Sequence, residues 1–196
     1  SACLVGSEMC IRDRIDAARR QLCTAIKMFF SREDPVAIHT VCWAAHMVLR
    51  TLAKKKGRGS IILDSNLIPE EMEKKFYKLM SRHSNFFKHA DRDYEQTIQY
   101  DPIMVQFWLF DACHMFEIIT KARTIEIIAF TCWFALAYPE FVIDGPMKTV
   151  LNQYKHIGLD FNDFETISIV IDPSKRSQNG MNMPPNLIGL IPIPDA

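Results

Sequence analysis

Glycine is scarce in this chain, and none of its seven glycines lies in a motif that binds phosphate groups. Neither GxGxxG nor GxxxxGK[ST] occurs among the 196 residues. In both motifs, glycine lets backbone N–H groups approach the phosphates of a nucleotide closely. The sequence therefore argues against a loop that cradles phosphate groups.

The chain also lacks an excess of charge of either sign. Lys and Arg together number 23, and Asp and Glu together also number 23. Without a net charge, no global field draws the whole protein onto nucleic acid or an anionic membrane. Any binding of RNA must therefore come from a local patch of the surface.

Signatures of cysteine and serine chemistry are missing as well. The chain has no CxxC pair and no GxSxG, and four of its six cysteines fall within apolar helical patterns. Buried, reduced thiols in a cytosolic protein are the ordinary interpretation of this usage, against a disulfide framework or a zinc site. We therefore expect a cytoplasmic protein without a metal or other cofactor. The four cysteines are Cys23, Cys42, Cys113 and Cys132.

Apolar residues recur every three or four positions along most of the chain, which is typical of helices. The pairs Asp34-Pro35 and Asp101-Pro102 offer an N-cap followed by proline at the first helical position. A run near 125–138 is apolar on nearly every side and should be central, although it is too short to span a bilayer. The sequence predicts a single all-α domain over 15–172, a bundle of about five main helices that span 15–31, 35–55, 69 to at least 83, 102–122 and 124–138.

Both ends of the chain have a different character. Residues 1–14, SACLVGSEMCIRDR, resemble translated sequencing-adapter read-through, so we expect an artefact or a disordered segment there. After Pro139 we expect a short helix over 146–156 and then a β-like segment, ETISIVI. The last segment, 173–196, is rich in proline and is predicted to be a flexible, extended tail.

The stretch RHSNFFKHAD, residues 82–91, carries the strongest candidate for chemistry. If the third helix continues to His89, about 100° per residue places Lys78, Arg82, Asn85 and His89 within one sector of roughly 60°. Arg82 and His89 would lie roughly 10 Å apart along the axis, and the long arginine side chain could bring both to one phosphodiester. The alternative is the polar edge of an ordinary helix.

These residues resemble the Rx4-6H motif of HEPN-domain proteins, in particular the abortive-infection branch. Arg82 and His89 match the motif at its longest spacing, and His83 matches the polar residue that the family favours after the arginine. Ala90-Asp91 is similar to the HAD ending of some members. The resemblance implies a helical bundle that forms a homodimer, binds RNA and in many members cleaves it without a metal ion.

By this resemblance His89 would take the proton from an RNA 2′-hydroxyl or bind the phosphate. Arg82 would stabilise the charge that develops on phosphorus. Asn85 and His83 would orient these two groups, and Lys78 would contact RNA. The alternative function is a non-catalytic helical module for protein interaction or structure.

A second set of residues, His39, Trp43, His46 and Arg50, shares one face of the predicted helix over 35–55. On an open surface, Trp43 would stack a base and Arg50 would contact a phosphate. The alternative is a face covered by a neighbouring helix, with Trp43 in the core and the histidines hydrogen-bonded. A similar stripe of Asp111, His114, Glu117 and Lys121 is predicted to be the solvated side of its helix.

Overall fold

The computed structural model describes residues 13–89, 91, 94–141, 160–183 and 188–193. In these residues the fold is all-α, as the sequence predicts, and the only sheet pairs two strands of two residues each. The helices are α1 (Arg14–Phe30), α2 (Pro35–Lys54), α3 (Glu70–Met80), α4 (Arg82–Phe86), α5 (Met104–Thr120), α6 (Ile125–Ala137), η1 (Pro139–Phe141), α8 (Phe164–Ile171) and α9 (Pro173–Gln178), and the strands are β1 (Ala122–Arg123) and β2 (Ile191–Pro192).

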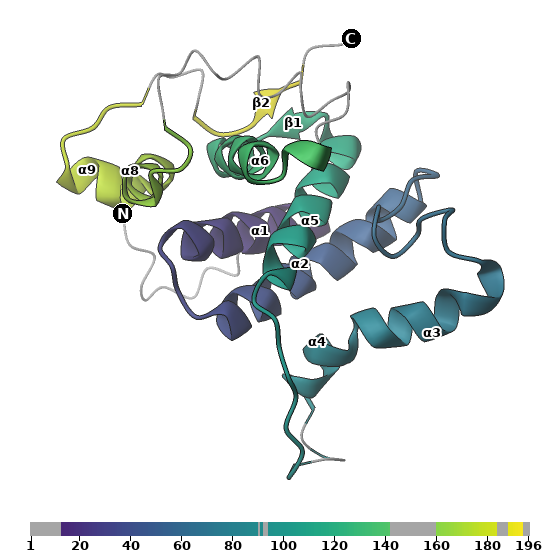
Figure 1. The fold of residues 1–196 in the computed structure, drawn as a ribbon. Helices are drawn as coiled ribbons and strands as arrows, with labels where there is room; N and C mark the ends of the chain where they lie inside the picture. Colours follow the sequence, from purple (N-terminus) through teal and green to yellow (C-terminus); the bar gives the residue numbers. More distant parts are fainter. Residues whose placement is uncertain (1–12, 90, 92–93, 142–159, 184–187, 194–196) are drawn as a thin grey trace, which may run out of the picture.

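The core lies between α1, α2, α5 and α6. Helix α2 packs along both α1 and α5, and α6 covers α1 and α5 on the side away from α2 (Figure 1). Ten residues of α6 are buried, among them Ile127, Phe130 and Phe134, because a helix that is apolar on every side must be enclosed. The predicted central position of this helix is therefore confirmed.

Capping side chains begin three of these helices. Asp34 accepts hydrogen bonds from the backbone N–H groups of Val36 and Ala37, at 2.9 and 3.1 Å, directly before Pro35. Thr124 caps α6 in the same way. Asp13 caps α1, which begins at Arg14, so these two residues belong to the fold and the expected boundary after residue 14 is wrong.

The expected β-like segment ETISIVI is a helix, which corrects the sequence prediction. Asp163 caps α8 by accepting from the backbone N–H of Thr166 at 3.1 Å. The buried residues Ile167, Val170 and Ile171 recur at three and four positions and face α1 and α6. Burial on one helical face outweighs the weak strand preference of β-branched side chains.

The described residues after 172 form more regular structure than the predicted extended tail. Asp172 caps α9, and Lys175 donates to the Ser31 hydroxyl at 3.0 Å. Further on, β2 pairs antiparallel with β1, and the N–H of Ile193 bonds to the carbonyl of Lys121 at 2.9 Å. The expected helix over 146–156 lies outside the described residues.

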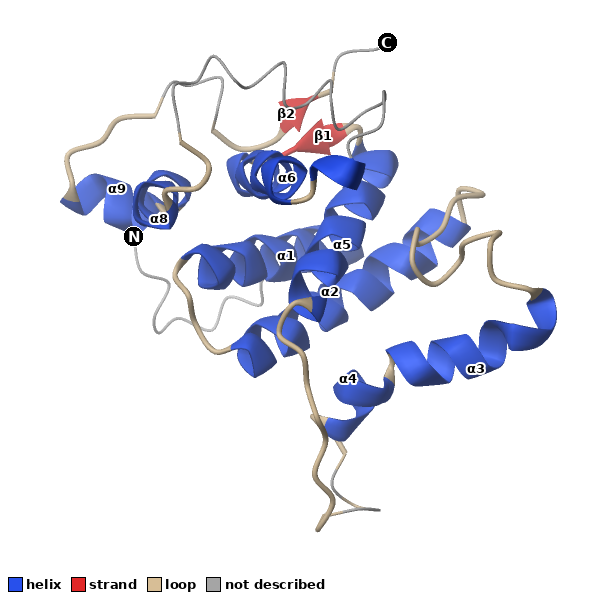
Figure 2. Cartoon of the chain, in the orientation of Figure 1, coloured by secondary structure: helices blue, strands red, loops and turns tan. Residues whose placement is uncertain are grey.

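The third helix ends before the predicted His83 and does not continue through His89, which corrects the sequence prediction. Helix α3 ends at Met80, Ser81 forms a turn, and α4 covers only five residues before the chain turns again at Phe87 and Lys88. No residue of α3 is buried. Figure 2 shows α3 at the edge of the molecule, with α4 at the end of α3 that is nearer the bundle. We call α3 and α4 together the arm.

By length and composition alone, α2 is apolar enough to cross a membrane. Its buried residues pack against α1 and α5 within the core of the described chain.

Candidate nucleic-acid groove

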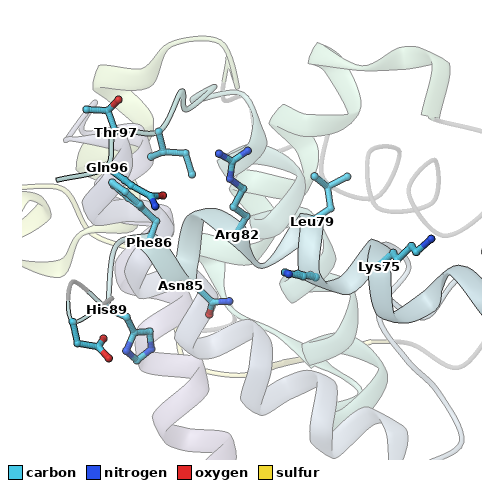
Figure 3. A pocket seen from close by; sticks show the side chains of 11 residues that line it. Lys75, Leu79, Arg82, Asn85, Phe86, His89, Gln96 and Thr97 are labelled. Carbon is cyan, nitrogen blue, oxygen red and sulfur yellow. The ribbon is translucent and has the colours of Figure 1, made fainter. Parts of the chain in front are cut away.

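An open groove of about 800 Å³ lies between the arm and the segment that follows it in the chain. Four of the residues that the sequence singled out line it together: Lys78, Arg82, Asn85 and His89. Figure 3 shows the side chains that line this groove. The remaining lining residues are Lys75, Leu79, Phe86, Asp91, Gln96, Thr97 and Ile98.

The local backbone explains why these residues gather although the helix is interrupted. Lys75, Lys78 and Arg82 are three and four positions apart, so they fall on one side of the arm. Beyond the break, the N–H of Asn85 bonds to the carbonyl of Ser81, and the N–H of His89 bonds to the carbonyl of Asn85, both at 3.0 Å. These two bonds keep the spacing of a helical turn and bring His89 to the groove.

Arg82 and His89 share the groove, but their side chains do not point at each other. Figure 3 shows the Arg82 guanidinium on one side of the α4 ribbon and the His89 imidazole on the other, the same side as Asn85. All three side chains are exposed. The arrangement thus offers separate contacts to a long ligand instead of one compact pair.

His83 lies on the inner side of α4 and does not line the groove. Its Nε2 lies 3.0 Å from the carbonyl oxygen of Gln99. Its ring packs against Tyr100, with centroids 5.2 Å apart, and against Phe87 and His39. The role that the family resemblance implies for His83, orienting the arginine and histidine, is therefore not the role that its contacts give it here.

The face of α2 that carries His39, Trp43 and His46 is covered by neighbouring helices, so of the two interpretations from sequence the open pocket is the wrong one. Their exposed fractions are 1%, 5% and 0%. The indole of Trp43 is stacked between the two imidazoles, with centroids 6.0 and 5.5 Å away and nearly parallel planes. The alternative from sequence, a covered face with hydrogen-bonded histidines, is the one that the structure has.

Arg50 is not open to a phosphate either, because Asp64 holds it. The Arg50 Nε donates to an Asp64 carboxylate oxygen at 2.8 Å, and Lys54 pairs with the same carboxylate at 2.7 Å. Burial alone would raise the pKa of Asp64. Hydrogen bonds from Arg50, Lys54 and the Ser60 backbone outweigh burial and hold this pKa well below its ordinary value.

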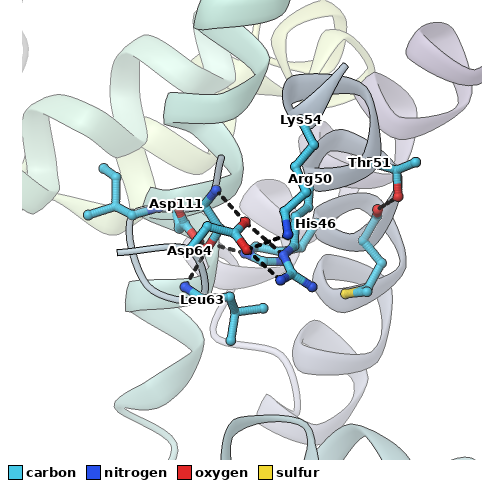
Figure 4. A network of polar contacts seen from close by, with 10 residues as sticks. His46, Arg50, Thr51, Lys54, Leu63, Asp64 and Asp111 are labelled. Carbon is cyan, nitrogen blue, oxygen red and sulfur yellow. Dashed lines mark hydrogen bonds and ion pairs between the residues drawn. The ribbon is translucent and has the colours of Figure 1, made fainter. Parts of the chain in front are cut away.

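Asp111 is completely buried, which overturns the prediction of a solvated stripe. One of its carboxylate oxygens contacts the Ser60 hydroxyl and lies 2.7 Å from the Nε2 of His46, and the other accepts from the Ile61 N–H at 2.8 Å (Figure 4). The aspartate, not the histidine, is central, so the set is no Ser-His-Asp triad. It fixes the segment after α2 against α5.

The rest of that predicted stripe is largely covered as well. Glu117 pairs with Arg123, whose Nε lies 2.9 Å from a carboxylate oxygen. His114 is partly buried, and that burial lowers the pKa of its imidazole. Only Lys121 is exposed, at the left-handed residue that ends α5.

A buried contact that the sequence did not reveal joins α2 to the arm. The Nε2 of His39 and the hydroxyl oxygen of Ser84 lie 2.7 Å apart, and both residues are 1% exposed. The Nδ1 of His39 lies 3.3 Å from the hydroxyl of Tyr100. Burial, with help from the charges of His83 and Lys88, lowers the pKa of His39 to about 4.

Comparison of the chain with models of known families, with curated proteins and with solved structures gives no match. The described residues contain no group of three or more His, Cys, Asp or Glu side chains placed to hold a metal ion.

Proposed function

We propose that the protein is a HEPN-like, RNA-directed protein of the cytoplasm, and that it binds single-stranded RNA in the groove beside the arm. One observation carries this proposal. The groove gathers three permanent cations, Lys75, Lys78 and Arg82, against one carboxylate, Asp91, in a chain whose formal net charge is zero. A local excess of two positive charges is what a polyanion needs from such a chain.

The other lining groups suit the bases of a single strand. Phe86 is partly exposed and offers a ring for stacking. Asn85, Gln96 and Thr97 offer amide and hydroxyl groups that hydrogen-bond to the edges of unpaired bases. Single-stranded RNA is therefore favoured over a duplex, whose bases are stacked and paired.

The proposal includes cleavage of the bound RNA strand. His89 accepts the proton of a 2′-hydroxyl, the 2′-oxygen attacks phosphorus, and the bond to the 5′-oxygen breaks, leaving a 2′,3′-cyclic phosphate. The departing 5′-oxygen takes a proton from water, and Arg82 stabilises the charge on the phosphoryl oxygens. Since the two side chains lie on opposite sides of α4, the bound strand or a second copy in a homodimer must bring them to one phosphate.

Two adjacent lysines of α3 provide the test. Lys75 lines the groove, whereas Lys74 lines a smaller hollow of about 360 Å³ with Arg50 and Tyr77. We expect Lys75→Ala to weaken binding of a fluorescent oligouridine, measured by anisotropy, and to lower the slope of log affinity against log salt by about 0.7. In the same samples with EDTA, His89→Ala should abolish cleavage of the strand.

The control is Lys74→Ala, which removes the same charge from the same helix and should leave binding unchanged. Equal losses in the two lysine variants mean that the groove is not the binding site. Cleavage that continues in His89→Ala and Arg82→Ala removes the catalytic part alone.

The alternative is a non-catalytic helical module that binds another protein. Leu79 and Met72 of α3 are 62% and 44% exposed, and they are the apolar side chains of the arm that such a partner would cover. Absence of RNA binding by the unaltered protein would favour this alternative.

A further inference from the structure

The two sides of α4 face different parts of the molecule. Arg82, Asn85 and Phe86 line the groove, whereas Ser84 is buried and faces α2. A helix of five residues has too few internal hydrogen bonds to hold its own position. The placement of the groove side chains therefore depends on what the inner side of α4 contacts.

His39 supplies the buried polar contact on that inner side. It belongs to α2, which packs along both α1 and α5, and its ring is stacked on that of Trp43. Both ring nitrogens have neighbours: Ser84 lies at one and Tyr100 at the other. The Tyr100 hydroxyl also lies 3.4 Å from the carbonyl oxygen of Pro35.

The aromatic side chains around this contact help to bury it but do little to fix the orientation of α4. The ring of Phe87 meets His39 edge-on at 5.5 Å, and Tyr100 does so at 5.6 Å. Such contacts tolerate small rotations, whereas a buried hydrogen bond at 2.7 Å fixes a donor and an acceptor in one alignment. The contact between His39 and Ser84 thus sets the rotation of α4.

We propose that His39 is a positioning residue of the RNA groove, and that its contact with Ser84 holds Arg82 and Asn85 in the orientation that RNA binding requires. This inference rests on the proposed function. Because formation of the His39–Ser84 contact and binding of RNA are linked equilibria, RNA in the groove must in turn stabilise this contact.

The first test compares two buried serines. Ser84→Ala breaks the contact with His39, and Ser60→Ala breaks a comparable buried contact with Asp111, away from the groove. We expect Ser84→Ala to weaken oligouridine binding roughly tenfold, which is the cost of losing one hydrogen bond from Arg82 to a phosphate. Ser60→Ala should leave binding unchanged although it also lowers stability. Equal losses in both variants overturn the proposal.

A double-mutant cycle separates positioning from general loosening. If Ser84 positions Arg82 and Asn85, the variant Ser84→Ala with Arg82→Ala loses less binding free energy than the sum of the two single losses. Additive losses overturn the inference. His39→Gln, whose amide can reach Ser84, should bind more tightly than His39→Leu, and equal binding by the two counts against the proposal.

Amide hydrogen exchange keeps the inference separate from the proposed function. If the unaltered protein binds no oligouridine, the proposed function fails. The effect of the His39–Ser84 contact is then tested by the exchange rates of the backbone N–H groups of Asn85, Phe87 and His89. These groups donate to backbone carbonyls in and directly beside α4. Ser84→Ala must speed their exchange and leave that of α6 unchanged. Unchanged exchange in the arm refutes the positioning role.

Discussion

Helices α6 and α3 differ in how much of each the rest of the molecule covers. Ten residues of α6 are buried, whereas α3 has none. The difference follows from composition: α6 is apolar all round, while α3 begins with Glu70, Glu71 and Glu73 and carries lysines further on. Acidic residues at the N-terminus complement the helix dipole of α3, and only Phe76 and Met80 of this helix pack against the core.

This contrast assigns most of the stability to the bundle and, under the proposed function, the binding of RNA to the arm. The bundle contains the apolar core and the buried contacts of Asp111, and the arm carries the exposed cations. Substitutions in the bundle should therefore change the free energy of unfolding, and substitutions of the arm residues that line the groove should change binding. His39 and Ser84 lie where the two regions meet.

The largest expected effect is in the bundle. Asp111→Ala leaves His46, Ser60 and the Ile61 N–H without their buried acceptor. We expect the free energy of unfolding to fall by about 3–5 kcal/mol, measured by urea denaturation, because unpaired buried polar groups are costly. The exposed carboxylate Glu95 is the control, and Glu95→Ala should stay within about 0.5 kcal/mol. A loss below about 1 kcal/mol for Asp111→Ala would contradict the central role of this carboxylate.

An intermediate effect is expected at the boundary, and it depends on pH. The pKa of His39 is lowered from 6.5 to about 4 in the folded chain, so only the unfolded chain takes up this proton between these values. The contribution of neutral His39 to the free energy of unfolding is therefore fully present above pH 6.5. It falls as the pH drops toward 4, by on the order of 2 kcal/mol. Denaturation at pH 7.5 and 4.5 should show this fall, and His39→Gln should show a smaller one.

Other groups near His39 bear on that measurement. His83 and Lys88 add positive charge that opposes its protonation, and Tyr100 stays neutral throughout this range because burial raises its pKa. Asp64, whose pKa is lowered, contributes to stability above its ordinary value of 3.8 and loses that contribution only at lower pH. Parallel losses for the unaltered chain and His39→Gln would mean that His39 is not the source.

Local signals predicted the bundle well, because capping and periodicity act over a few residues. Asp34-Pro35 and Thr124 begin α2 and α6 where the sequence indicates. The matching prediction for Asp101-Pro102 is wrong, because α5 begins at Met104 with no capping side chain. The helix at 164–171 was missed because its β-branched residues suit a strand equally well, and only packing against α1 and α6 decides between them.

The candidate site was predicted in part. The spacing of Lys78, Arg82, Asn85 and His89 correctly placed them together in one groove. It did not predict that α4 ends at Phe86 and that the chain turns at Phe87 and Lys88, so that Arg82 and His89 lie on opposite sides of the α4 ribbon. The burial of Asp111 was unpredictable for another reason. Its partners, Ser60 and Ile61, lie 51 and 50 positions earlier, so no local pattern reports them.

The smallest expected effect is on the arm. Leu79 is an apolar residue in the middle of the groove wall, and a substitution there would be severe if α3 were a core helix. Because its side chain is 62% exposed, Leu79→Ala should change the free energy of unfolding by less than about 0.5 kcal/mol. Phe130→Ala in α6, where the ring is fully buried, should cost about 3–5 kcal/mol in the same denaturation series. A large loss for Leu79→Ala would show that the arm is packed in solution, against a second copy or the bundle, and would end the separation of the two regions.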